Sequence, residues 1–198
     1  MDQSLPSGGI IWRVLGAWAD LRGSMRAELD RDPSEGRLLF YLMLSGLIWF
    51  IGRNAVLVYG PLGPVISEEQ FLGRVGVEII AAIFLRTLAF YPLAALAGMI
   101  ARAAGGSGSW RDSRAALFWA ALVAAPVILA GTLLSLLLTG LPGQASAIAG
   151  MLGTVAFAWA VAQCIAEAHG FASAWRVLAV LATLAAAVIG GVYLLGRI

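Results

Sequence analysis

The chain has 198 residues, of which 61% are hydrophobic and only 12% are charged. A soluble domain is about half apolar and a quarter charged, and a chain of this length has too little interior to hide the excess. The composition therefore excludes a soluble globular protein and indicates a membrane protein. The formal charge of +2 does not suggest a nucleic-acid partner.

The basic and sulfur-containing residues exclude several kinds of chemistry. All thirteen basic residues are arginine, so neither a Schiff-base lysine nor a phosphate-loop lysine is possible. The single cysteine, Cys164, rules out an intrachain disulfide and a cysteine-rich metal site, and we expect it to be a buried thiol. We expect no metal and no cofactor.

Residues 1–36 form a cytoplasmic segment in our interpretation. Apolar residues recur at helical spacing from Ile10 to Leu29, with charges mostly on the other side, which is typical of an amphipathic helix in the membrane interface. Alternatively, the apolar stripe packs on the rest of the protein or on a partner. The segment lacks the features of a secretory signal, so we expect the mature chain to begin at or near Met1.

Residues 37–198 carry five apolar segments long enough to cross a bilayer, which takes about 20 residues. The fold class we predict is all-α, a polytopic bundle of five transmembrane helices that follows the N-terminal amphipathic helix. The expected spans are 37–58, 75–101, 115–139, 145–166 and 174–195.

Three interruptions shape these spans. Residues 59–64 break the helix after the first span, and Ser67 can cap the next one. Pro92 predicts a kink in the second span, and residues 102–114 form a polar loop with a Gly-Gly-Ser-Gly-Ser linker. A tight turn at residues 140–143 makes the third and fourth spans antiparallel neighbours.

The distribution of arginine predicts the orientation, since basic residues near span ends stay in the cytoplasm. With the N-terminus inside, nine arginines are cytoplasmic and three lie on the opposite side. We expect a bacterial cytoplasmic (inner) membrane protein with a cytoplasmic N-terminus and a periplasmic C-terminus.

Polar side chains within the spans are the candidate functional residues. If the second span enters the bilayer near Val77, Arg86 lies about 13 Å down, close to the midplane. Its expected partner is Asn54, a carbonyl freed by Pro92 or an acid of another chain. Arg53 and Glu78 either form an ion pair or each reach their own interface.

A second group of polar residues lies at the end of the fourth span. Gln163 and Glu167 are one turn apart, and we interpret them as hydrogen-bonded contacts between helices. His169 is expected to be an exposed loop residue. No catalytic constellation is recognisable, so we do not expect an enzyme.

Small residues are expected to let the helices approach closely, because packing rather than the hydrophobic effect drives helix association in lipid. The candidate packing residues are Gly98, Gly150, Gly153, Gly190 and Gly191.

The sequence resembles the Yip1 family in its bacterial form. The resemblance lies in the loop at residues 105–114, the following residues 115–120, the Ala-Ala-Pro at 124–126, and the turns at 32–33 and 167–170. It implies a five-span topology with a cytoplasmic N-terminus and a non-enzymatic role. The Asp-Leu-Gly-Pro type signature of eukaryotic members is absent, so their vesicle or small-GTPase binding is not carried over.

Two functions remain open at this point. The first is a scaffold or accessory subunit that associates with other membrane proteins, or with itself as an oligomer, or organises the bilayer. The second is a small transporter or lipid-handling protein that uses buried Arg86 to contact an anionic headgroup or solute.

Overall fold

The computed structural model describes residues 9–59, 68–139 and 145–195, and every regular element in these ranges is helical. The elements follow in this order: α1 (Ile10–Gly16), the 3-10 turn η1 (Ala17–Ala19), α2 (Leu21–Asp30), α3 (Glu35–Tyr59), α4 (Glu68–Ile80), the π-helical turn η2 (Ala81–Leu85), α5 (Arg86–Ala103), α6 (Trp110–Leu137), α7 (Ala145–Ala168) and α8 (Ala174–Leu195). The breaks expected at residues 59–64 and 140–143 and the cap at Ser67 lie largely or wholly outside the described residues.

Four described helices are long and apolar enough to cross a membrane: Glu35–Val56, Glu69–Ala103, Trp110–Leu137 and Ser146–Ala168. The multi-pass character expected from composition is therefore confirmed. α8 has the bounds expected for the fifth span, but its described apolar stretch, Ala174–Leu184, is shorter than a span. The count of five stays a prediction.

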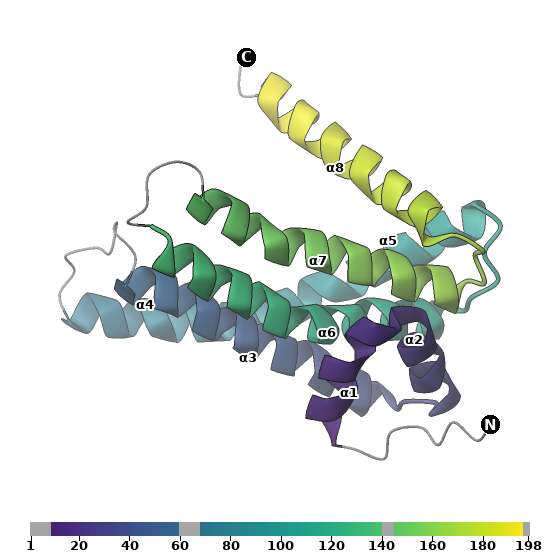
Figure 1. Cartoon of the computed structure of the whole chain (residues 1–198), viewed down its shortest axis with the longest axis horizontal. Coiled ribbons are helices and arrows are strands. Elements are labelled where there is room, and N and C mark those ends of the chain that lie inside the picture. Colours follow the sequence, from purple (N-terminus) through teal and green to yellow (C-terminus); the bar gives the residue numbers. More distant parts are fainter. Residues whose placement is uncertain (1–8, 60–67, 140–144, 196–198) are drawn as a thin grey trace.

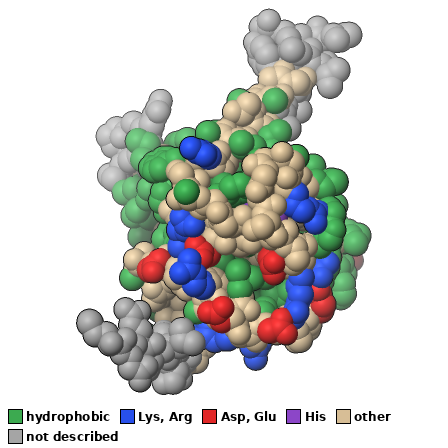
Figure 2. Space-filling model, turned by 90° about the vertical axis from the view of Figure 1, so that its right-hand side faces the viewer, with side chains coloured by type: hydrophobic (Ala, Val, Ile, Leu, Met, Phe, Trp, Pro, Cys, Tyr) green, Lys and Arg blue, Asp and Glu red, His purple; other side chains and the backbone are tan. Residues whose placement is uncertain are grey.

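α6 is the central helix of the bundle. It packs against α3, α5 and α7, which lie alongside it (Figure 1). Every residue from 115 to 125 is buried, so the helix is enclosed on all sides over three turns. This part of α6 begins near one end of the bundle, where α2, the α5–α6 turn and the α7–α8 turn also meet. We call this end of the bundle the charged end, because acidic and basic side chains gather there (Figure 2).

The N-terminal segment differs from the single helix expected over residues 10–29. The helix is interrupted by η1, and Asp20 starts α2 by accepting a hydrogen bond from the Gly23 amide at 2.8 Å. The bend lets both short helices reach the bundle core, where the buried residues of the segment pack: Val14, Ala17, Leu21 and Met25. The alternative in which the apolar stripe packs on the protein therefore holds for these residues.

The α5–α6 loop is shorter than the expected polar loop of residues 102–114. α5 continues to Ala103, and α6 begins at Trp110 with a capping box. The Ser109 hydroxyl accepts from the Asp112 amide, and the Asp112 carboxylate accepts from the Ser109 amide. Ser109 caps the helix, and Trp110, Arg111 and Asp112 form its first turn, although all four lie within the loop expected from the sequence.

The second span is one continuous helix from α4 to α5, with a π-turn at η2 before Pro92. At this turn α3 and η2 approach each other so closely that a Cβ on Gly46 would collide with the Ala82 carbonyl oxygen. Glycine at residue 46 is therefore a condition for this helix contact.

α8 leaves the bundle soon after it begins. It contacts α7 near its N-terminal end and then diverges, so its distal half stands apart from the other helices (Figure 1). The predicted bounds of this helix are correct, whereas its separation from the bundle had no signal in the sequence.

We expect Gly46→Ala to destabilise the fold by about 1–3 kcal/mol, because the new methyl group must displace the backbone of Ala82. Gly76→Ala is the matched control, since Gly76 also lies within a helix and has open space around it. It should be neutral or stabilise by up to about 1 kcal/mol. Thermal unfolding in mild detergent measures both changes, and equal midpoints for the two variants would contradict the close contact.

Candidate functional site

A buried carboxylate, Glu28, joins the N-terminal helices to the bundle at the charged end. Its side chain is 0% exposed, and the Tyr41 hydroxyl of α3 donates a hydrogen bond to it at 2.6 Å. Arg13 of α1 forms an ion pair with the same carboxylate, and Arg31 lies 3.5 Å from it. The Arg13 guanidinium also lies 5.2 Å from the centre of the Trp119 ring of α6. Four helices thus contribute to one polar cluster.

Sequence reasoning did not single out Glu28, although a signal was available. Leu21, Met25 and Glu28 are spaced as neighbours on one helix face, and the first two are buried in the core. An acidic residue that continues an apolar stripe needs a buried cation, and the arginines of the same segment supply it.

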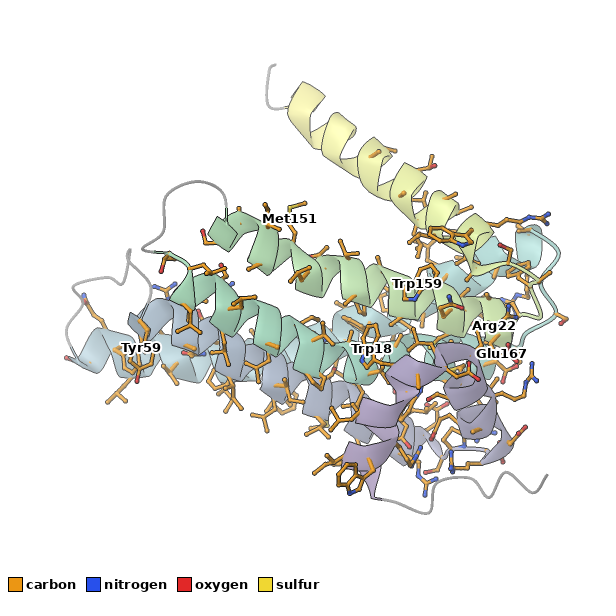
Figure 3. The ribbon with its side chains drawn as sticks, in the orientation of Figure 1. Trp18, Arg22, Tyr59, Met151, Trp159 and Glu167 are labelled. Carbon is orange, nitrogen blue, oxygen red and sulfur yellow. The ribbon has the colours of Figure 1, made fainter. Side chains whose placement is uncertain are left out.

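Glu167 holds the second contact between the N-terminal segment and the bundle. Its side chain is 7% exposed, and it accepts hydrogen bonds from Arg22 at 2.9 Å and from Arg26 at 2.6 Å (Figure 3). Arg22 also donates to the carbonyls of Phe171 and Ala172. Glu167 therefore connects α7 to the N-terminal helix α2, and not to another membrane-spanning helix as expected. Gln163 lies one turn earlier on α7 and is half-buried.

Two further ion pairs surround the start of α3. Arg111 pairs with Asp32 at 2.5 Å and donates to the Pro33 carbonyl, and Arg114 pairs with Glu35. These pairs are more exposed than the pairs of Glu28 and Glu167, so each contributes less to stability.

His169 is buried, and the expectation of an exposed loop histidine is wrong. The residue is 2% exposed because the Gly-rich loop closes over it: Gly106 and Gly108 both lie where a Cβ would meet the His169 ring. The loop is therefore a packed element and not a free linker, and only glycine leaves room for the imidazole.

The hydrogen bonds around His169 indicate that its Nε2 atom carries a proton. The Ser113 hydroxyl donates its one proton to the Ser109 carbonyl at 3.0 Å, so the Nε2–H of His169 donates to Ser113 Oγ at 3.0 Å. The other ring nitrogen, Nδ1, is buried without a hydrogen-bond partner among the described residues. Burial lowers the pKa of His169; the Asp112 carboxylate opposes this effect and Arg102 adds to it.

The intramembrane polar residues form two separate groups. Arg53 lies 3.5 Å from Glu78, and the Asn54 amide donates to the same carboxylate at 3.4 Å. Arg74 lies 3.4 Å from it as well. The structure thus brings Arg53, Asn54 and Glu78 together at the end opposite the charged end.

Within the described chain, Arg86 contacts neither Asn54 nor a carbonyl freed by Pro92, and an acid of another chain stays untested. Its guanidinium donates to the Ser45 hydroxyl at 2.8 Å and to the Leu42 carbonyl at 3.2 Å, both on α3, and lies 4.5 Å from the centre of the Phe90 ring. The π-turn just before Arg86 and the close approach at Gly46 set α5 beside these acceptors. The cation is satisfied within the chain, which favours a structural role.

The candidate packing glycines divide into two groups. Gly98 contacts Ser113 of α6 and Gly153 contacts Ile128 of α6, in both cases so closely that a Cβ would collide. Gly150 has only the Ser135 hydroxyl nearby, at 3.8 Å from an added Cβ. Gly190 and Gly191 have no atom of the described chain within 4 Å of such a Cβ.

The paired charges of the charged end connect helices to one another. In the described ranges no three His, Cys, Asp or Glu side chains come together to hold a metal, and Cys164 is buried within α7 as expected. Paired charges at the charged end connect α1 with α2, α2 with α7, and α6 with the start of α3. They hold the short N-terminal helices against the end of the bundle.

We expect Ser45→Ala to destabilise the fold by about 1–3 kcal/mol, because Arg86 then keeps a single hydrogen-bond acceptor. Thr183→Ala is the control, since the Thr183 hydroxyl also bonds a carbonyl of its own helix but receives no cation. Thermal unfolding in mild detergent compares the two; an equal effect would show that Ser45 does not hold Arg86.

We expect stability to fall as the pH drops below about 6.5, the ordinary pKa of histidine. Because the pKa of His169 is lowered in the fold, the unfolded chain binds the proton first. The contribution of His169 to the free energy of unfolding is therefore fully present above about pH 6.5, and it is lost as the pH falls toward the pKa of His169 in the folded state. His169 is the one histidine of the chain, so His169→Gln should remove this dependence. A pH series of unfolding temperatures that keeps the same slope in the variant would contradict it.

Comparison with known proteins agrees with the resemblance noted in the sequence. No curated protein and no solved structure matches the chain. The family model of the Yip1 domain matches residues 23–195, from α2 to the end of α8. The matched range contains all four helices that are long enough to cross a membrane. Because the match covers most of the chain, this protein belongs to the Yip1 family.

Proposed function

We propose that this protein is a non-enzymatic scaffold or accessory subunit of a bacterial cytoplasmic membrane that associates laterally with other membrane proteins or with copies of itself. The observation that carries the proposal is the separation of α8 from the bundle (Figure 1). Its distal half has small residues without neighbours, among them Gly190 and Gly191. In lipid, small residues are the ones that let a second helix approach closely.

In this proposal α8 is the fifth span, and the charged end faces the cytoplasm. Support comes from the arginines, nine of which belong to the helix ends and loops that meet at the charged end, whereas Arg53 and Arg74 lie at the other. The positive-inside rule then puts the N-terminus in the cytoplasm and the C-terminus in the periplasm.

α1 supports a contact between the charged end and the lipid headgroups. Ile11, Trp12 and Leu15 are 69%, 71% and 53% exposed, although the other face of the helix is fixed to the protein through Val14 and Arg13. An apolar face with a tryptophan at the edge of a bundle is typical of an interfacial helix. In our proposal α1 thus contacts protein on one side and lipid on the other.

The transporter or lipid-handling alternative based on Arg86 has less support. An arginine that binds a substrate must be free to exchange its partners, and Arg86 is held by Ser45, Leu42 and Phe90. The carboxylate near it in sequence, Glu78, is used by Arg53 and Arg74.

Native mass spectrometry of the tagged protein, extracted gently from its own membrane, tests the proposal. We expect a defined heavier complex, and replacing both Gly190 and Gly191 by leucine should reduce it, because the larger side chains separate the helices. The matched control replaces Gly73 and Gly76 of α4 by leucine; they have equally open surroundings but lie on a different helix. A clean monomer from the wild-type protein would contradict the proposed function.

A further inference from the structure

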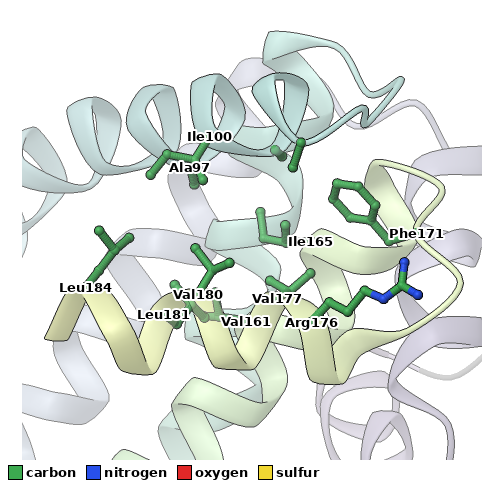
Figure 4. Close-up of a pocket in the computed structure, with 12 residues that line it drawn as sticks. Ala97, Ile100, Val161, Ile165, Phe171, Arg176, Val177, Val180, Leu181 and Leu184 are labelled. Atoms are coloured by element: carbon green, nitrogen blue, oxygen red, sulfur yellow. The ribbon is translucent and has the colours of Figure 1, made fainter. Parts of the chain in front are cut away.

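An apolar groove opens where α8 leaves the bundle, between α5, α7 and α8 (Figure 4). Twelve residues line it, and all but Arg176 are apolar. Ala97 and Ile100 contribute from α5, Val161 and Ile165 from α7, and Val177, Val180 and Leu184 from α8. A groove of this composition binds a hydrocarbon and excludes water.

The groove runs from the charged end into the apolar part of the bundle. Arg176 lies in the first turn of α8, and Leu184 lies eight residues further along the same helix. At about 1.5 Å per residue, this distance is about 12 Å. The hydrocarbon of one leaflet is about 15 Å thick, half of the bilayer core, so the groove has the length of one leaflet.

Arg176, like Arg37 and Arg102, has no ionic partner among the described residues, whereas Arg22, Arg26, Arg111 and Arg114 at the same end each pair with a carboxylate. Of the three arginines without an ion pair, Arg176 is the one that lines the groove. No hydrogen bond or ion pair joins Arg176 to another described residue, and its side chain is exposed at the mouth of the groove (Figure 4). The charge that would complement it is an anion at the level of the lipid headgroups.

The charge at the mouth of the groove distinguishes between occupants. The groove has a cavity volume of about 160 Å³, and its lining is apolar except for Arg176. An exposed cation beside an apolar groove matches a molecule that combines an anionic headgroup with a hydrocarbon chain. A second apolar helix offers the hydrocarbon surface without the anion.

We propose that this groove binds one anionic phospholipid from the leaflet at the charged end. One of its two acyl chains lies along Val177, Val180 and Leu184 and the other stays in the bilayer, while its phosphate accepts hydrogen bonds from the guanidinium of Arg176. Arginine suits this position because its planar donors match two phosphate oxygens at once. The site is separate from Gly190 and Gly191, which carry the proposed association with other proteins.

The first test replaces Arg176 by glutamine in protein reconstituted into nanodiscs of equal parts phosphatidylglycerol and phosphatidylcholine. Native mass spectrometry after release should show one retained phosphatidylglycerol on the wild-type protein. Arg176→Gln should reduce its retention about tenfold, since the charged hydrogen bonds to phosphate are lost. Arg37→Gln is the matched control, because Arg37 is also exposed at the charged end without an ion pair among the described residues but does not line the groove.

The second test fills the groove. Val180→Trp should exclude the lipid whatever its headgroup, because Val180 lines the groove and is 42% exposed. Ala182→Trp adds the same ring to α8 at an exposed residue outside the groove and should leave retention unchanged. Unfolding temperatures of the four variants show that each remains folded.

Four results would overturn the proposal. Wild-type protein without a retained phospholipid would exclude the site, and equal loss in Arg37→Gln would reduce it to general attraction by surface charge. Retention that both Arg176→Gln and Val180→Trp leave intact would identify the lipid as part of the unspecific shell. A second copy or another protein that disappears in Val180→Trp, without any lipid, would assign the groove to a protein partner.

Discussion

Two buried carboxylates hold the N-terminal helices onto the charged end of the bundle. Glu167 of α7 pairs with Arg22 and Arg26 of α2. Glu28 of α2 pairs with Arg13 and Arg31 of the same N-terminal segment, and the Tyr41 hydroxyl of α3 connects this cluster to the bundle. A buried carboxylate that loses its cations is left without compensation, which costs far more than the pairs themselves contribute. The two clusters therefore determine where α1 and α2 lie relative to the spans.

Polar side chains in the membrane-spanning helices also find partners within the chain. Arg86 donates to acceptors on α3 because the π-turn at Ala81–Leu85 and the close contact at Gly46 bring the two helices together. Glu78 is shared between Arg53, Arg74 and Asn54. Polar groups within lipid require internal partners, and these contacts supply them.

Several glycines of the packed bundle have close neighbours, whereas those in the distal half of α8 have open space around them. Gly98 and Gly153 are in direct contact with α6, and Gly106 and Gly108 enclose His169. Gly190 and Gly191 also lie within an apolar helix, but this helix, α8, leaves the bundle (Figure 1). Small residues thus serve internal packing in α5 and α7, whereas in α8 they remain available, and the groove beside Arg176 arises from the same divergence.

The sequence by itself determined the helical class, the membrane environment and the approximate bounds of the long helices, because each of these depends on composition and on the length of apolar runs. It indicated the family through the loop and turn motifs at residues 105–120, 124–126, 32–33 and 167–170. It also indicated that Arg53 and Glu78 could pair, since both lie at similar depth. Only the tertiary structure decided that His169 is buried, that Glu28 has a cluster of partners and that Arg86 uses α3. It alone showed the bend at Ala17–Ala19 and the departure of α8. These features depend on which distant segments meet. A local pattern shows that a buried polar side chain such as Glu28 needs a partner, but it does not by itself identify the residue that supplies one across the bundle.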